Sequence, residues 1–154
     1  MPQFEHPEHT HRRVRPFKLS ERRIWPGCIE IEVEGELDLA VSDRLHAALE
    51  AAKGSPCHVL IDLGACDFID SSGLAVLLAA SRACAAGNRQ LLLYGVHGQV
   101  RRMLSVTGLS ENGLLVAAGN AAAFPPAAVL DQGFSVTLAN GESARLQPSG
   151  ATAP

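Results

Sequence analysis

The stretch FIDSSGLAVLLAASRACAAGN, from Phe68 to Asn88, places an acid, two hydroxyls and a glycine directly in front of an almost wholly apolar run. The apolar run predicts a helix over residues 71–86, closed by the Gly-Asn pair that follows it. Either Asp70 or Ser71 can cap such a helix, because its first amides have no partner within the helix. One capping residue would be enough, so the motif raises the question of a second purpose.

On the N-terminal side of this stretch the sequence predicts a strand followed by a helix. The apolar residues of the segment 28–33 alternate with Cys28 and Glu30, which is typical of a strand with one buried face. The segment 40–52 has apolar residues at helical spacing. We expect this helix to be capped by Ser42 or an adjacent residue.

Further strands and a third helix complete the pattern. Residues 57–63 and 90–96 are short apolar runs, typical of strands covered on both faces. Residues 98–109 predict an amphipathic helix, with Thr107 among the inward-facing side chains. Residues 113–118 predict a last short strand. This alternation of strand and helix indicates an α/β domain with largely parallel neighbours and right-handed crossovers.

The two ends of the chain differ in composition from its centre. We expect residues 1–13 to be a disordered tail and residues 14–118 to form the domain. Residues 119–154 are expected to be an Ala/Pro-rich extension with a short helix near the Pro125-Pro126 pair. Within that extension, Asn140-Gly141 lies between two alternating segments and predicts a hairpin.

Composition limits the classes of function. The 154 residues suit one domain, 47% of them are hydrophobic, and the formal net charge of -3 does not favour nucleic acid or anionic membrane as a partner. The four cysteines form no C-x-x-C pair, so we expect buried reduced thiols rather than a zinc site. We find no bilayer-spanning run and no N-terminal signal region. We therefore expect a cytoplasmic protein with no metal and no cofactor.

A hydroxyl at the start of a helix suits a reversible chemical switch. Phosphorylation would add about -1.5 to -2 charges, which the positive end of the helix dipole tolerates. Asp70 is adjacent to Ser71, and Asp38 ends the first long strand. Because the carboxyl ends of parallel strands gather at one rim, we expect Asp38 to lie close to Ser71. A phosphate there would repel a docked partner, although a capped helix without a switch remains open from the motif alone.

Three segments together resemble the anti-sigma-factor antagonist family, whose fold is the STAS domain (sulfate transporter and anti-sigma factor antagonist). GELDL, residues 35–39, resembles the family's strand-end motif, and FIDSSGLAVLL, residues 68–78, resembles its phosphorylation-site segment. VRRMLSVTGL, residues 100–109, is similar to its third helix and the turn that follows. The resemblance implies a STAS-like α/β fold, with a four- to five-stranded mixed sheet and helices mainly on one side.

The resemblance also implies a role in partner switching. In this family the unmodified protein binds an anti-sigma factor that is also a serine kinase, and a sigma factor is thereby freed. The kinase phosphorylates the serine after the motif aspartate, which corresponds to Ser71, and a serine phosphatase reverses the step. The partner-binding residues that the resemblance implies are Asp38, Asp70, Ser71, Ser72, Gly73 and Leu74. We expect a monomer or weak dimer that makes no direct contact with nucleic acid and does not span a membrane.

Two other function classes compete with this interpretation. A STAS module that is not phosphorylated could act as a small-ligand or nucleotide sensor, or as a scaffold subunit, and would be indifferent to Ser71→Asp. An enzyme is the other alternative. The sequence shows no G-x-S-x-G elbow and no Walker A loop, and His46, His58 and His97 are scattered along it. We therefore expect no catalytic residues.

Overall fold

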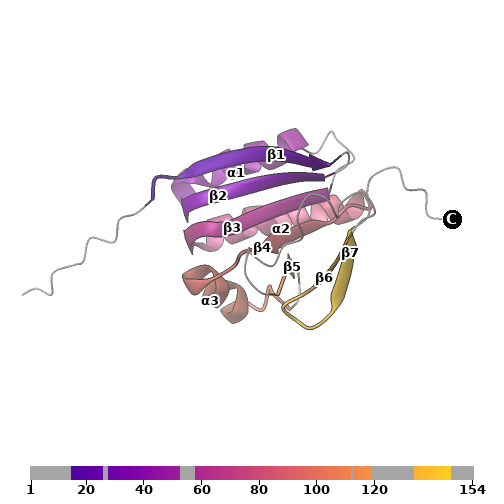
Figure 1. The fold of residues 1–154 in the computed structure, drawn as a ribbon. Helices are drawn as coiled ribbons and strands as arrows, with labels where there is room; N and C mark the ends of the chain where they lie inside the picture. Colours follow the sequence, from indigo (N-terminus) through magenta and orange to yellow (C-terminus); the bar gives the residue numbers. More distant parts are fainter. Residues whose placement is uncertain (1–14, 26–27, 53–57, 112, 119–133, 147–154) are drawn as a thin grey trace, which may run out of the picture.

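The computed structural model describes residues 15–25, 28–52, 58–111, 113–118 and 134–146 of the chain. Its centre is a five-stranded sheet in the order β1-β2-β3-β4-β5, with a separate two-stranded β6-β7 hairpin (Figure 1). The strands are β1 (Lys18–Trp25), β2 (Cys28–Leu37), β3 (His58–Ile69), β4 (Leu91–Tyr94), β5 (Leu115–Val116), β6 (Phe134–Thr137) and β7 (Ser143–Leu146). The helices are α1 (Leu39–Ala52), α2 (Ser71–Ala86) and α3 (Gly98–Val106).

The sheet is mixed, as the family resemblance implied. Strands β2 to β5 are parallel to one another, whereas β1 pairs antiparallel with β2 at the edge. The strand-by-strand analysis did not predict β1. Its sequence, KLSERRIW, is mostly polar, and its charged side chains pair across the ladder, with Lys18 opposite Glu34 and Arg22 opposite Glu30. An edge strand of this kind lacks the apolar alternation that identifies a buried strand.

The main core lies between the sheet and the three helices. Alternate side chains of β2, β3 and β4 point to this face, and the buried helix residues Leu45, Leu49, Leu77, Val100 and Leu104 pack against them. Figure 1 shows α1 and α2 running side by side along one face of the sheet. The prediction that the helices lie mainly on one side is therefore confirmed, and α2 has the predicted bounds.

The opposite face of the sheet carries a second, smaller core that the sequence analysis did not foresee. Strands β6 and β7 form the hairpin predicted at Asn140-Gly141, and Gly141 adopts the positive φ of 88° that such a turn requires. Leu138, Ala144 and Leu146 from this region pack on side chains of β2, β3 and β4. Backbone hydrogen bonds from Ala118 to Thr137 and from Ala139 to Val116 attach the hairpin beside β5.

This second core corrects the expectation that β2 has only one buried face. Cys28 is fully buried and Glu30 is only 6% exposed, although both lie opposite the helix-facing side chains. Glu30 is buried with its charge paired. Arg22 donates to Glu30 Oε2 at 2.6 Å, and the Tyr94 hydroxyl donates to Oε1. Burial and the bond to Glu30 raise the pKa of Tyr94, so the phenol stays a donor.

Two details of the helices also differ from expectation. Helix α1 begins at Leu39, so Ser42 lies inside the helix and is buried rather than acting as its cap. Thr107 is exposed at the end of α3, where its hydroxyl donates to Met103 O at 2.6 Å, instead of facing inward. A threonine in the last turn of a helix can satisfy its hydroxyl on the preceding carbonyls, so helical spacing alone does not place it in the core.

Several other expectations concern cysteines, termini and membrane spans. Cys28, Cys66 and Cys84 are buried free thiols, as expected, whereas Cys57 lies outside the described residues. The predicted tail at residues 1–13 and the short helix near Pro125 also lie outside them. In the part of the chain that is described, the helices are too short or too polar to cross a membrane.

Candidate functional site

The ends of β2 and β3 meet the starts of α1 and α2 at one rim of the sheet. Leu37 and Ile69 pair as the last residues of their strands, so the next residues, Asp38 and Asp70, emerge side by side. The Asp70 amide donates to Leu37 O at 3.2 Å across this junction. The structure thus brings Asp38 and Asp70 together at the rim, as the parallel-strand argument predicted.

Asp70 holds the starts of both helices. Its Oδ1 accepts from the amides of Ser72 at 2.9 Å and Gly73 at 3.1 Å, which are the unpaired donors of the first turn of α2. Its Oδ2 accepts from the Leu39 amide at 3.0 Å, at the start of α1. One carboxylate therefore caps α2 and also fixes α1 against it, a role that goes beyond local capping.

Asp38 has a more local role. Its Oδ1 accepts from the Ala40 amide at 3.0 Å, so it caps α1 in the ordinary way. The residue after it, Leu39, exposes 72% of its surface although it is a large apolar residue. The sequence analysis treated Leu39 only as the end of a motif and missed it as a surface residue. A single exposed leucine is ordinary on a protein surface, so Leu39 matters here only through its place beside the polar groups of the rim.

Ser71 is the first residue of α2 and is exposed, while Ser72 is half-buried. Helix α2 has no acidic residue in its first turn, so the positive end of its dipole meets only the Asp70 cap. A phosphate on Ser71 would stand at this end without unfolding the helix, because helix N-termini accept anions readily. Ser71 is thus both reachable and able to carry added charge.

Gly73 and Leu74 lie beneath this surface. A Cβ on Gly73 would lie 2.8 Å from Leu37 O, which is closer than side-chain carbons normally approach backbone. The glycine therefore lets the first turn of α2 rest directly on the end of β2. Leu74 is 5% exposed and belongs to the main core. The structure places both residues at the rim but turns them inward.

A further residue at the rim, Gln99 of α3, was not singled out in the sequence. Its Oε1 accepts from the Ile69 amide and its Nε2 donates to Ile69 O, both at 2.9 Å. The side chain of Gln99 thus pairs with the strand residue next to Asp70 as a neighbouring strand would. In the same region His97 Nε2 lies 3.0 Å from Gly64 O. These contacts join residues that are 30 or more positions apart in the sequence, so no local sequence pattern predicts them.

The described residues hold no cluster suited to a metal ion, and their histidines lie apart. No group of three or more His, Cys, Asp or Glu side chains in the described ranges could hold a metal ion. The histidines lie apart: His46 is on the exposed side of α1, His58 begins β3, and His97 precedes α3 at the other end of the sheet. Cys66 lies under the rim, where burial raises the pKa of its thiol to about 11 and its Sγ donates to Phe68 O. A protonated thiol of this kind is a poor nucleophile.

Comparison with known proteins identifies the fold. The family model described as "Mlab, STAS domain" matches residues 21–117. The chain belongs to the STAS domain family. Among curated proteins, this STAS domain is 33% identical to the anti-sigma-B factor antagonist of Listeria monocytogenes over 84 residues, which cover 54% of this chain and 74% of the relative.

Two further comparisons agree. The anti-sigma F factor antagonist of Paenibacillus polymyxa is 31% identical over 85 residues, which cover 54% of this chain and 73% of the relative. The crystal structure of an anti-sigma factor antagonist from Mycobacterium paratuberculosis superposes with a TM-score of 0.59 at 23% identity, covering 68% of this chain and 87% of the other, which supports the fold. This STAS domain therefore falls within the anti-sigma factor antagonist family, as its three sequence motifs suggested.

Proposed function

We propose that this STAS domain is an anti-sigma-factor antagonist that binds a kinase-type anti-sigma factor through the rim and is switched off by phosphorylation of Ser71. The observation that carries this proposal is the position of Ser71, exposed at the first residue of α2 beside a carboxylate that fixes both helix starts. A serine phosphatase restores the binding state. In this proposal Ser71 is a substrate of the partner, and the domain itself catalyses no reaction.

The binding surface consists of the rim residues that are at least partly exposed. These are Asp38, Leu39, Asp70, Ser71 and Ser72. Leu39 offers an apolar contact, and the hydroxyls of Ser71 and Ser72 offer polar contacts beside it. Gly73 and Leu74 are buried, so they do not touch the partner directly. They contribute by fixing how closely the first turn of α2 packs on the end of β2.

Phosphorylation would act on binding and spare the fold. A phosphate brings about -1.5 to -2 charges to a surface that already carries two carboxylates. In the free domain the α2 dipole and water offset the new charge, whereas a docked partner would exclude that water and face the repulsion. The partner class requires no nucleic-acid contact and no membrane span. A sigma-factor switch of this kind operates in the cytoplasm, where transcription takes place.

The test is capture of partners from the native lysate with wild type, Ser71→Asp and Ser105→Asp as baits. Ser105 is an exposed serine in the last turn of α3 and is not one of the rim residues named above, so Ser105→Asp adds the same charge at another exposed serine. We expect wild type and Ser105→Asp to capture a kinase-type anti-sigma factor, and Ser71→Asp to bind it about 100-fold more weakly, as a buried like-charge contact of a few kcal/mol implies. Incubating the captured complex with ATP should then place phosphate on Ser71, as read by peptide mass spectrometry.

The alternative function, an unphosphorylated ligand sensor or scaffold subunit, gives the opposite result. If Ser71→Asp captured the same proteins as wild type, or if the captured kinase left Ser71 unmodified, the switch would be excluded. Ser71 would then serve only as the first residue of a capped helix.

A further inference from the structure

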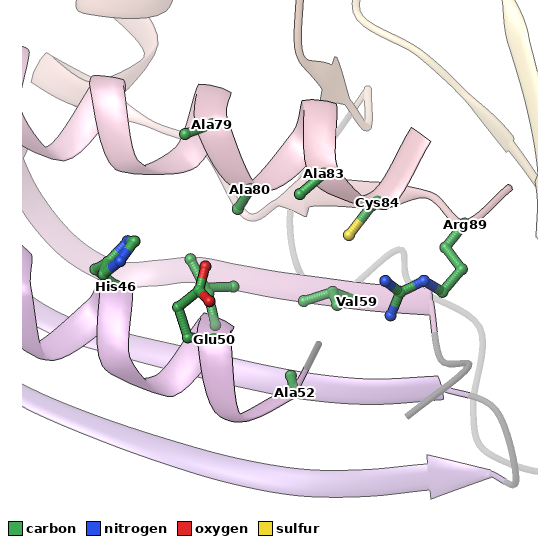
Figure 2. Close-up of a pocket in the computed structure, with 10 residues that line it drawn as sticks. His46, Glu50, Ala52, Val59, Ala79, Ala80, Ala83, Cys84 and Arg89 are labelled. Carbon is green, nitrogen blue, oxygen red and sulfur yellow. The ribbon is translucent and has the colours of Figure 1, made fainter. Parts of the chain in front are cut away.

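A cavity of about 150 Å³ lies between α1 and α2, beyond the half of α2 that carries Ser71. Figure 2 shows the second half of α2 above it, the second half of α1 below it and Val59 of β3 behind. Small side chains create this space. Ala79, Ala80 and Ala83 line the α2 wall, and Leu49 and Ala52 line the α1 wall. The two helices therefore leave a hollow over the sheet where larger residues would have closed it.

The size of the cavity and its apolar floor indicate the body of a ligand. A dry apolar cavity of about 150 Å³ is large enough to hold a benzene ring. The inner surface consists of aliphatic side chains and the Cys84 thiol, which is 6% exposed and faces the cavity in Figure 2. Burial raises the pKa of Cys84, so the thiol remains neutral at physiological pH and brings no negative charge into the site.

The mouth of the cavity carries charges of both signs. Arg89 follows α2 and extends its guanidinium beside Val59, while His46 and Glu50 stand on α1 at the other side (Figure 2). A guanidinium has five donors in a planar fork that matches a carboxylate, so it can serve a ligand in addition to neighbours in the protein.

We propose that this cavity is a binding site for a small apolar monocarboxylate, with its ring or chain between α1 and α2 and its carboxylate on Arg89. The chemistry is that of an aromatic acid such as benzoate or of a short fatty acid. A neutral analogue loses the charged contact to Arg89.

This site is separate from the proposed switch. Ala79, the lining residue of α2 nearest to Ser71, lies eight residues further along the helix, which corresponds to about 12 Å at 1.5 Å per residue. A ligand in the cavity and a partner on the rim can therefore be bound at the same time. Failure of the ligand proposal would leave the partner-switching proposal untouched, and the reverse also holds.

The test is a titration of the full ¹⁵N-labelled chain with benzoate, followed by amide chemical shifts. We expect saturable shifts at Val59, Ala83 and Cys84, with Arg89→Gln weakening binding about tenfold, the effect of one charged hydrogen bond. Arg82→Gln is the matched control, because Arg82 is an exposed arginine of α2 outside the cavity lining. Benzyl alcohol, a neutral analogue of similar size, should bind about tenfold more weakly than benzoate, because it cannot form a charged hydrogen bond with Arg89.

A pair of filling variants tests the location. Ala83→Leu places three extra carbons in the cavity, whereas Ala85→Leu adds the same atoms on the exposed side of α2. We expect Ala83→Leu to abolish the shifts and Ala85→Leu to preserve them. Shifts that survive Ala83→Leu in a folded variant, equal binding of benzyl alcohol, or no shift at the cavity residues at millimolar benzoate would each overturn the proposal. If Ala83→Leu does not fold, benzoate binding by Arg89→Gln remains the test of the proposal.

Discussion

Helices α1 and α2 begin in the same way and at the same rim, yet their starts are held unequally. Each follows a strand end and an aspartate cap, and each exposes its first residue, Leu39 in α1 and Ser71 in α2. Asp38 accepts from one amide of its own helix, whereas Asp70 accepts from two amides of α2 and one of α1. The start of α2 therefore organises the start of α1, and the dependence runs in one direction.

This asymmetry places Ser71, the hydroxyl proposed for phosphorylation, on the better-anchored helix. A switch that adds charge needs a scaffold that does not move when the charge arrives. Ser71 directly follows the carboxylate with the most partners at the rim, so the proposed phosphate changes the surface without loosening it. Leu39 provides the apolar contact beside it, on the helix whose position depends on Asp70.

The largest expected effect comes from removing the two caps in turn. Asp70→Ala leaves three amides without their acceptor, and we expect it to lower the free energy of unfolding by about 3 kcal/mol. Asp38→Ala leaves one, and should cost about 1 kcal/mol. Urea unfolding with unchanged m-values measures both. Equal losses would show that the two additional bonds of Asp70, including the one from the Leu39 amide, contribute nothing to stability.

A second substitution tests the contact of α2 with β2. Gly73→Ala drives a Cβ to 2.8 Å from Leu37 O, and we expect a loss of about 2 kcal/mol from overpacking. Val41 is the third residue of α1, as Gly73 is of α2, and Val41→Ala introduces the same alanine without a clash. It should cost less than about 1 kcal/mol, since Val41 is only half-buried. If Gly73→Ala were as stable as wild type by thermal unfolding, α2 could shift away from Leu37 O at little cost in free energy.

Alkaline pH probes what lies beneath the two helix starts. The pKa of Cys66 is raised from its ordinary value of 9.0 to about 11, mainly by burial. Between these values the unfolded chain has lost the thiol proton and the folded chain keeps it, so stability falls as pH rises, by about 1.4 kcal/mol per pH unit.

Two cysteine variants separate this contribution from others. Cys66→Ala should flatten the fall between pH 9 and 11 in urea midpoints, although Tyr94, whose pKa is also raised, keeps part of it. Cys84→Ala should flatten it less, because Arg89 offsets part of the effect of burial there. If stability fell equally steeply with pH in wild type and in Cys66→Ala, the raised pKa of Cys66 would not be the cause of the fall.

The smallest expected effect on stability concerns the exposed leucine. Leu39→Ser should change the free energy of unfolding by less than about 0.5 kcal/mol, because most of the side chain is already in water. If the rim is the docking surface, the same variant should weaken binding of the captured anti-sigma factor about tenfold, as loss of an interface apolar contact of 1–2 kcal/mol implies. Val106→Ser is the control, since Val106 is equally exposed on α3. Equal effects of the two variants on binding would remove Leu39 from the surface.

The sequence predicted those features that depend on neighbouring residues. The apolar run and its polar start fixed the bounds of α2, and Asn140-Gly141 fixed the hairpin, because helix caps and tight turns are local chemistry. The meeting of Asp38 and Asp70 also followed, since parallel strands bring their ends to one rim. These parts of the candidate site needed only the order of the elements.

Other features depend on segments that are distant in the sequence. The burial of Cys28 and Glu30 requires a hairpin more than one hundred residues later, so the alternation in β2 indicated an exposed face. The start of α1 was predicted one residue too late, at Ala40 instead of Leu39, because GELDL was interpreted as a motif at the end of the strand. The contacts of Gln99 with Ile69 and of Asp70 with Leu39 exist only once the strands and helices are assembled.

The Gln99 contact also makes one amide proton a reporter of a distant helix. Strand β4 pairs with β3 only as far as Asp62, and the Ile69 amide is bonded instead by a side chain of α3. Exchange of that proton with solvent therefore requires the Gln99 side chain to release it, while exchange at Val59 requires its backbone bond to Gln90 to open. The ratio of the two exchange rates, each corrected for its intrinsic rate, gives the difference between the free energies of these two openings. A spectrum of the labelled domain with an unlabelled partner would show whether docking at the proposed rim surface changes that difference.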